Sequence, residues 1–142
     1  MHRGFRCEDL MAQTFDSESF DLVITSDVFE HLPDASAAVR EIMRTLKPGG
    51  AHIFTVPWVR WNKTLVRALL KDGVVQHLEK PDYHGNPIDE SGSLVFTEWG
   101  LELPFLLQDW GEFPVTSHAI RDRSLGIDGQ FLEVFVQQKH YS

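Results

Sequence analysis

The chain has 142 residues, 42% of them hydrophobic, and carries a formal net charge of -8 at pH 7. This acidic balance argues against nonspecific binding to nucleic acids or anionic membranes, because both attract clusters of Lys and Arg. The single cysteine, Cys7, excludes an intrachain disulfide and a cysteine-rich zinc site, so we expect a cytoplasmic protein. The length predicts one domain over residues 1–142, and the charge favours a small molecule or a protein as its partner.

The first segment of the chain predicts little regular structure. Residues 1–7 are long enough for only a short strand, and residues 11–19 form a polar connector with one aromatic side chain, Phe15. No apolar run approaches the roughly 18 residues of a membrane span, and the amino terminus lacks the apolar core of a signal peptide. We therefore expect no direct contact with a membrane.

A strand, a helix and a second strand follow. The apolar run Leu22–Ile24 ends in polar residues, as in a strand buried on both faces whose carboxyl end opens into a crevice, where ligands bind in open α/β sheets. Asp34 can cap a helix that Lys47–Gly50 ends, and Ala51–Val56 reads as another buried strand. Strand, helix and strand together predict a right-handed parallel βαβ unit. The apolar positions of the helix follow helical spacing and are Ala35, Ala38, Val39, Ile42, Met43 and Leu46.

The middle of the chain reads as an insertion, residues 57–96, over the carboxyl edge of the sheet. Asn62 can cap a short helix with apolar positions between Leu65 and Leu70, which Gly73 would close. Residues 74–96 are irregular because proline, glycine and acidic residues interrupt them.

The last third predicts a helix and two strands. Thr97 can cap a helix to Trp110, which Pro104 would either kink or restart as a first-turn proline. Residues 113–120 and 130–139 are rich in strand-forming residues and predict an antiparallel pair at the far edge of the sheet.

Several of these segments resemble one family in their order. Phe20-Asp21-Leu22-Val23, Asp27 to Asp34 and Leu46-Lys47-Pro48-Gly49-Gly50 are similar to class I S-adenosylmethionine-dependent methyltransferases of the type-11 small-molecule group, and Glu8-Asp9-Leu10 is similar to the segment that precedes them there. The resemblance implies an α/β fold. It would be a partial Rossmann-like sheet with parallel strands and one antiparallel strand, flanked by helices.

In that family the strands lie in the order three, two, one, four, five, seven, six, with strand seven antiparallel. This chain maps to the tail of strand three and to strands four to seven, so the first βαβ unit with its glycine-rich cofactor loop would lie upstream of Met1. The strand around Leu22–Thr25 would then have an unprotected edge, and such edges recruit another chain. We therefore expect a homodimer through this edge.

The resemblance also implies cofactor contacts. Asp9 would accept a hydrogen bond from the adenine amino group of S-adenosylmethionine, and Leu10 would offer its backbone amide to the ring. Ser26 and Asp27 would contact the methionine portion through their backbone, and Phe29 would pack near the sulfonium. The alternatives are a solvated loop carboxylate for Asp9 and a core position for Phe29.

Glu30-His31 is the most chemically suggestive pair. By resemblance to quinone O-methyltransferases, His31 is a candidate general base. A related pair helps to hold a divalent metal in small-RNA 2'-O-methyltransferases, so a ligand role is a second possibility, and a structural histidine that satisfies a loop or helix terminus is a third. Because no fourth ligand can be assigned, no metal site is predicted.

The insertion supplies further candidates for the acceptor site. Tyr83-His84-Gly85-Asn86-Pro87 resembles a segment of one branch of the family, which implies that Tyr83 and His84 face the acceptor together with Trp58. A loop held by its own Asn-Pro turn explains the same residues.

The resemblance thus implies S-adenosylmethionine-dependent methyl transfer to an oxygen, nitrogen or carbon of an unknown small-molecule acceptor. Without the glycine-rich loop, cofactor binding by this chain alone is in doubt. The alternatives are a noncatalytic remnant that acts as an oligomerising domain and one half of a split methyltransferase.

Overall fold

A four-stranded mixed sheet forms the body of the molecule in the computed structural model, which describes residues 6–59, 63–85 and 90–141. The strand order is β1 (Phe20–Ser26), β2 (Leu46–Thr55), β10 (Glu133–Gln138) and β9 (Val115–Ala119). β1 and β2 are parallel, whereas β10 is antiparallel to both β2 and β9. This arrangement confirms the predicted parallel pair, the antiparallel pair and the order four, five, seven, six.

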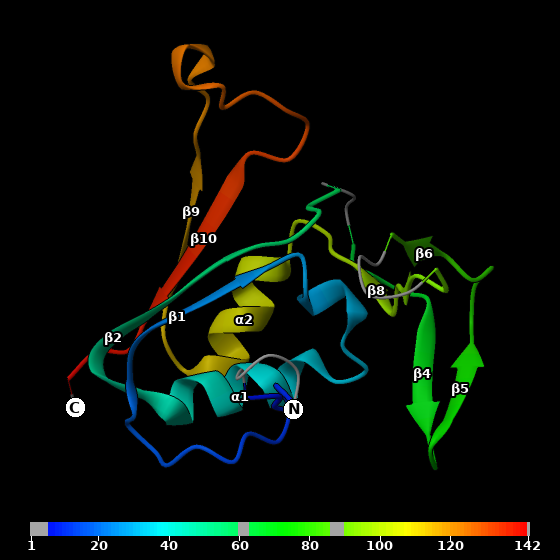
Figure 1. Ribbon diagram of the computed structural model, residues 1–142, viewed down its shortest axis with the longest axis horizontal. Helices are drawn as coiled ribbons and strands as arrows, with labels where there is room; N and C mark the ends of the chain where they lie inside the picture. Colours follow the sequence, from blue (N-terminus) through cyan, green and yellow to red (C-terminus); the bar gives the residue numbers. More distant parts are fainter. Residues whose placement is uncertain (1–5, 60–62, 86–89, 142) are drawn as a thin grey trace.

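Two helices cover one face of this sheet (Figure 1). α1 (Ala35–Thr45) begins as predicted, because a carboxylate oxygen of Asp34 accepts a hydrogen bond of 3.0 Å from the backbone N–H of Ala37. α2 (Leu103–Gly111) starts later than the predicted helix from Thr97, and Pro104 lies in its first turn, where its missing N–H costs nothing.

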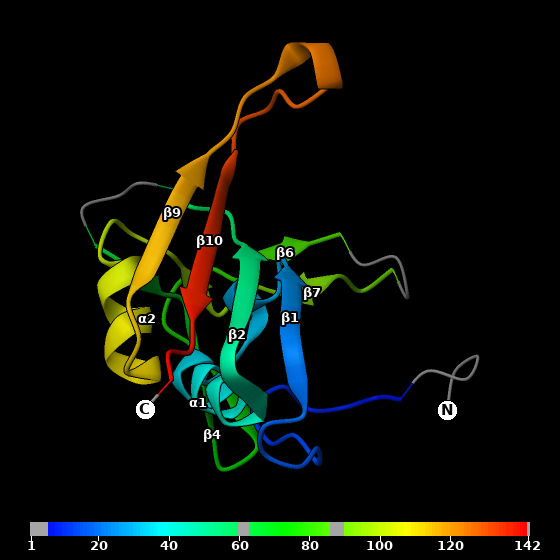
Figure 2. The same cartoon turned by 90° about the vertical axis from the view of Figure 1, so that its left-hand side faces the viewer.

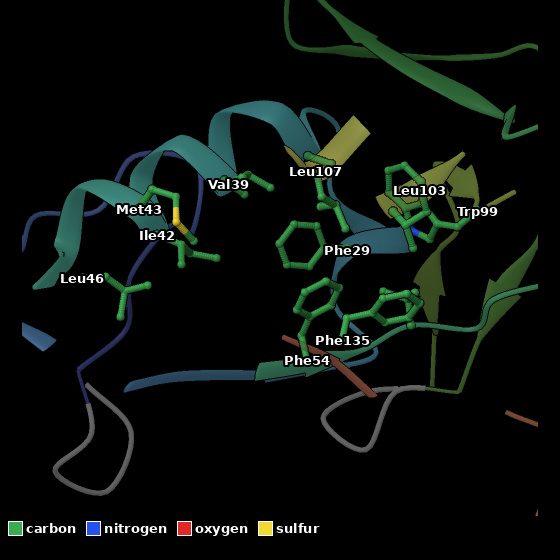
Figure 3. Packing of buried hydrophobic residues seen from close by; sticks show 13 residues of the cluster. Phe29, Val39, Ile42, Met43, Leu46, Phe54, Trp99, Leu103, Leu107 and Phe135 are labelled. Atoms are coloured by element: carbon green, nitrogen blue, oxygen red, sulfur yellow. The ribbon is translucent and has the colours of Figure 1, made fainter. Parts of the chain in front are cut away.

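The core lies between the helices and the buried face of the sheet. Phe29, Phe54 and Phe135 form its aromatic centre, and the rings of Phe54 and Phe135 stack with centroids 5.2 Å apart (Figure 3). Every apolar position predicted for the first helix is buried. None of the described helices is long and apolar enough to cross a membrane.

β1 is not buried on both faces, and that prediction is wrong for the described residues. Leu22 is 48% exposed and Ile24 is 68% exposed, because both helices lie on the other side of the sheet. Among the described strands β1 pairs only with β2, so one edge of β1 has no strand beside it.

The turn between α1 and β2 also differs from the prediction. β2 begins at Leu46 and includes the segment expected only to end the helix. A side chain at Gly50 would come within 3.0 Å of the carbonyl oxygen of Asp21, so glycine allows the two strands to approach each other here.

The predicted helix over Leu65–Leu70 is wrong: this segment forms β3 (Leu65–Val66) and β4 (Ala68–Lys71), and β4 makes a hairpin with β5 (Val74–His77). The hairpin forms because Asp72 and Gly73 both have left-handed backbone angles, with φ of 51° and 76°, as a two-residue type I′ turn requires. The predicted cap, Asn62, lies outside the described residues.

Three more short strands lie between β5 and α2. β6 (Tyr83–His84) pairs with β7 (Ser93–Leu94), and β8 (Thr97–Glu98) pairs with β3. Thr97 is therefore a strand residue and not a helix cap. Figure 2 shows β6 and β7 beyond the arrowhead of β1, at the end of the sheet where the sequence predicts a ligand.

Candidate functional site

The carboxyl end of β1 turns sharply at Asp27, which has a left-handed φ of 51°. Its backbone N–H donates a hydrogen bond of 3.0 Å to the carbonyl oxygen of Thr55, at the end of β2. The hydroxyl oxygens of Ser26 and Thr55 lie 3.0 Å apart. The two parallel strands therefore end together in a group of polar side chains, and the chain turns from there into the short 3-10 helix η1 (Phe29–His31).

Glu30 is the buried acid of this region. Its side chain is 2% exposed, and neither carboxylate oxygen has a hydrogen-bond partner among the described residues. Burial raises the pKa of the Glu30 carboxyl, because the charged form loses its hydration. The Glu30 carbonyl oxygen accepts a hydrogen bond of 2.8 Å from the backbone N–H of Phe96, which fixes η1 against the insertion.

His31 points its second nitrogen at this acid. Nδ1 lies 2.8 Å from the carbonyl oxygen of Leu94 and must be the donor, since a carbonyl oxygen only accepts. Nε2 is then the basic nitrogen, and it lies 3.6 Å from Oε1 of Glu30. The Leu94 contact thus selects the tautomer and the ring orientation of His31.

His84 approaches the same acid from β6. Its Nδ1 lies 3.8 Å from Oε1 of Glu30, and its ring meets the His31 ring edge to face at a centroid distance of 4.9 Å. The side chain is 40% exposed and can be reached from solvent. The structure therefore brings together the two histidines that the sequence singled out, although residues 84 and 31 lie far apart in the chain.

Two cavities open beside this group. The larger has a volume of about 510 Å³ and is lined by Asp27, Glu30 and His84, by residues 55–57 at the end of β2, and by residues before and at the start of β10, including Phe131. The other, of about 310 Å³, lies against Glu30, His84, Val95 and Thr97. Both cavities give a small molecule access to the acid and to one histidine.

Trp58 and Tyr83, two of the residues predicted to contact the acceptor, line neither of the two cavities beside the histidines. Trp58 lines a third cavity of about 450 Å³, which shares Phe131 with the larger of the two others. Tyr83 is 54% exposed, and because neighbouring strand residues point to opposite faces, it faces away from the cluster that its neighbour His84 joins. The role of Tyr83 toward an acceptor stays a prediction.

The predicted cofactor residues are also only partly assembled. Ser26 and Asp27 lie at the site, whereas the segment that contains Asp9 and Leu10 runs near the opposite end of β1 in Figure 2. The Asp9 carboxylate accepts a hydrogen bond of 2.9 Å from the backbone N–H of Met11, and Leu10 packs against the core. Phe29 is fully buried, which matches its alternative as a core residue. Contacts of these residues with a cofactor remain predictions.

Glu30 was singled out in the sequence only as the neighbour of His31, and no role of its own was predicted for it. A carboxylate directly before His31 was visible in the sequence, but its burial depends on Phe96 and β7, far along the chain. The resulting group of Glu30, His31 and His84 can accept a proton from an acceptor molecule or bind a cation.

Comparisons with known proteins connect part of the chain to one family. A family model described as a methyltransferase domain matches residues 2–54. A 2-methyl-6-phytyl-1,4-hydroquinone methyltransferase of Synechocystis sp. is 33% identical over 75 residues, covering 46% of this chain and 24% of that protein. A tocopherol O-methyltransferase of Arabidopsis thaliana is 38% identical over 59 residues, covering 42% of this chain and 17% of that protein. The chain thus matches less than two thirds of the length of either relative.

Solved structures extend the likeness in fold to nearly the whole chain. An S-adenosylmethionine-dependent methyltransferase of Methanosarcina mazei has a TM-score of 0.58 at 18% identity, covering 97% of this chain and 68% of that one. The 1,6-didemethyltoxoflavin-N1-methyltransferase of Burkholderia thailandensis, solved with S-adenosylhomocysteine bound, has a TM-score of 0.51 at 18% identity and covers 93% and 48%. The chain therefore has the fold of class I S-adenosylmethionine-dependent methyltransferases, and its residues 2–54 match the methyltransferase-domain family.

Proposed function

We propose that this chain takes part in methyl transfer from S-adenosylmethionine to a small-molecule acceptor, with an aromatic hydroxyl as the favoured acceptor group. The observation that carries the proposal is the group of Glu30, His31 and His84 beside Asp27, at the strand end where this fold binds ligands. The bound cofactor would supply an electrophilic methyl group on a sulfonium. The hydroquinone and tocopherol named for two relatives support an aromatic hydroxyl.

The histidines are suited to activate such an acceptor. A hydroxyl oxygen that forms a bond to the methyl carbon, while the carbon–sulfur bond breaks, must give up its proton. His84 lines both adjoining cavities and its side chain is 40% exposed, so an acceptor there can reach it, while the His31 side chain, 20% exposed, packs edge to face against the His84 ring. We assign the activation of the acceptor to these two residues.

An aromatic acceptor also fits the lining beyond the histidines. Phe131 borders all three cavities and is 45% exposed, and Trp58 presents its ring on the third one. Aromatic side chains of this kind offer planar apolar contacts to a substrate ring. We propose that Trp58 and Phe131 contact the acceptor on the side away from Glu30.

Cofactor contacts follow the predicted assignments. Ser26 and Asp27 would meet the methionine portion, since both stand at the carboxyl end of β1. Asp9 and Leu10 would serve the adenine end if their segment reaches it in the bound state. We place this activity in the cytoplasm, which the single, exposed Cys7 favours.

The exposed side of β1 supports a second proposal, self-association. Leu22 and Ile24 lie exposed on a strand with one unpaired edge among the described residues, and a second copy could cover both in a twofold dimer. If the chain is one half of a split enzyme, the same surface would bind the other half. If it is a noncatalytic remnant, self-association through this surface would be its function. Light scattering of the purified chain tests this, and a strict monomer would contradict it.

The experiment for the main proposal is calorimetric titration of the chain with S-adenosylmethionine and S-adenosylhomocysteine. Saturable binding, followed by transfer of a labelled methyl group to simple hydroquinones, is the expected result. Absence of binding at millimolar ligand, in a chain with a cooperative thermal transition, would contradict catalysis by this chain alone and favour the remnant. Binding restored by a glycine-rich partner protein would favour the split enzyme.

A further inference from the structure

The Glu30 carboxylate is an unusual group for the interior of a protein. A buried carboxylate costs several kcal/mol unless a positive charge or hydrogen bonds compensate it. Glu30 has no hydrogen bond from the described residues to either oxygen, and ring nitrogens of His31 and His84 lie 3.6 and 3.8 Å from its Oε1. These distances are too long for hydrogen bonds but leave space for a small cation between the three groups.

The donor atoms form a compact set. One carboxylate oxygen and two imidazole nitrogens, from Glu30, His31 and His84, all lie within 4.8 Å of one another. Ligand atoms held at about 2.1 Å from a tetrahedral zinc ion are separated by about 3.4 Å. Small rotations of the side chains would therefore bring the three atoms to ligand distances.

The orientation of His31 is already that of a metal ligand. Its Nδ1 donates to the carbonyl oxygen of Leu94 at 2.8 Å, which leaves the Nε2 lone pair directed toward Glu30. Histidine ligands commonly donate their other ring nitrogen to a carbonyl or carboxylate in this way. Because Leu94 lies in β7, opposite Tyr83 of β6, the same pair of strands carries both this carbonyl and His84.

We infer that Glu30, His31 and His84 bind one divalent transition-metal ion of the zinc type. Two imidazole nitrogens and one carboxylate oxygen select zinc or cobalt over magnesium and calcium, which prefer oxygen ligands. Three protein ligands leave a coordination position that faces the cavities beside Glu30. The ion would satisfy the buried carboxylate without a charged histidine.

Metal binding stands on this geometry alone, whereas its use in catalysis rests on the proposed methyl transfer. An acceptor hydroxyl bound at the open position would lose its proton to water more easily, because a metal ion stabilises the oxyanion. His31 and His84 would then activate the acceptor through the metal. The binding inference does not depend on that step.

The test is calorimetric titration of the full chain with zinc chloride after dialysis against EDTA. We expect one zinc ion per chain and at least tenfold weaker binding of magnesium. The variants Glu30→Gln and His84→Ala should each weaken zinc binding by at least tenfold. His77→Ala, in the exposed β5 hairpin, is the matched control and should leave zinc binding unchanged. Cobalt, titrated in place of zinc, should give a visible absorption band that the Glu30 and His84 variants lose.

Two results would overturn the inference. One is the absence of saturable zinc binding, and the other is equal zinc affinity in the parent chain and in His84→Ala. His84 is 40% exposed, so this variant keeps the test valid even if Glu30→Gln does not fold. Titration with S-adenosylhomocysteine in EDTA separates the proposals. Cofactor binding without zinc binding contradicts only the metal site, and zinc binding without cofactor binding contradicts only the methyl transfer.

Discussion

The ring of His31 is anchored to the main chain of Leu94 by a hydrogen bond of 2.8 Å that spans 63 positions of sequence. Through this contact, the short strands β6 and β7 set the direction of a side chain that belongs to the βαβ unit. Residues of β6 and β7 therefore help to shape the site.

His84→Ala should lower kcat/KM for methyl transfer to a hydroquinone by about 100-fold or more, as for loss of a group that activates the acceptor. The variant His77→Ala, an exposed histidine of β5, should retain the activity of the parent chain. A labelled-methyl assay measures both. Equal activity in the two variants would remove His84 from the acceptor site.

The stability of the fold should fall as the pH decreases from 6.5 toward 3, because of His52. This side chain is fully buried against the Phe54 ring, and burial lowers the pKa of His52 to about 3. Between those pH values the unfolded chain binds a proton at His52 that the folded chain does not bind. The unfolded state is therefore stabilised relative to the folded state as the pH falls. The contribution of His52 between pH 7 and pH 5 is about 2 kcal/mol.

Urea unfolding of the parent chain and of His52→Gln at both pH values isolates this contribution. Gln is close to His in volume and does not titrate. The free energy of unfolding of the variant should therefore change by about 2 kcal/mol less between pH 7 and pH 5 than that of the parent chain. Identical pH profiles would show that His52 is not buried in its neutral form.

Phe54→Ala should destabilise the protein by about 3 to 5 kcal/mol, since it removes a ring from the closed aromatic core and leaves a cavity. Phe105→Ala makes the same chemical change on the surface of α2, where the ring is 69% exposed, and should have an effect below about 0.5 kcal/mol. Denaturant unfolding measures the two. If Phe54→Ala does not fold at all, Phe54→Leu should lower the free energy of unfolding by a smaller amount.

Gly73→Ala should weaken the β4–β5 hairpin by about 1 kcal/mol, because its φ of 76° disfavours a side chain while the space around it is open. Gly85→Ala is the control, since no atom of the described residues lies within 4 Å of its added methyl group and its φ is not positive. Amide hydrogen exchange of residues 69–76 should become about fivefold faster in the first variant alone. Equal exchange rates in both would contradict the type I′ turn.

Asp9→Ala should weaken binding of S-adenosylhomocysteine by about 1 to 3 kcal/mol if this carboxylate meets the adenine amino group. Asp16→Ala, another acidic residue of the same exposed segment, serves as the control. Calorimetry decides the assignment. Unchanged affinity in Asp9→Ala would show that the carboxylate does not contact the cofactor. Its role would then be the local hydrogen bond that it accepts from Met11.

The parts of the fold that the sequence predicts well are those with a long periodic signal or a strong local cap. α1 has both, in its buried apolar face and in Asp34, and the strands on either side of it were equally clear. The β9–β10 pair was visible because two strand-forming runs flank a polar loop. In each case neighbouring residues and not distant contacts decide the conformation.

The failures have causes that the structure identifies. Leu65, Leu69 and Leu70 fit a helical face, but the Asp72-Gly73 turn fixes a hairpin and outweighs that weak periodicity. Thr97 has a side chain that can cap a helix, yet it pairs with β3. The helix begins only at Leu103, with Pro104 in its first turn.

The site was predicted only in its ingredients. His31 and His84 stood out as chemistry-bearing residues, but no local pattern could show that both approach the buried carboxylate of Glu30. That convergence depends on long-range contacts of η1 with Leu94 and Phe96, which a single sequence does not reveal.

The position of β10 between β2 and β9 has a consequence for how the protein is made. On the ribosome, every other described strand of the main sheet emerges before β10, and β9 meets the sheet only through it. The nascent chain must therefore hold an incomplete sheet, with one edge of β2 unpaired, until residue 138 has left the exit tunnel. Slow translation late in the message would prolong this state, when a chaperone has the most surface to bind.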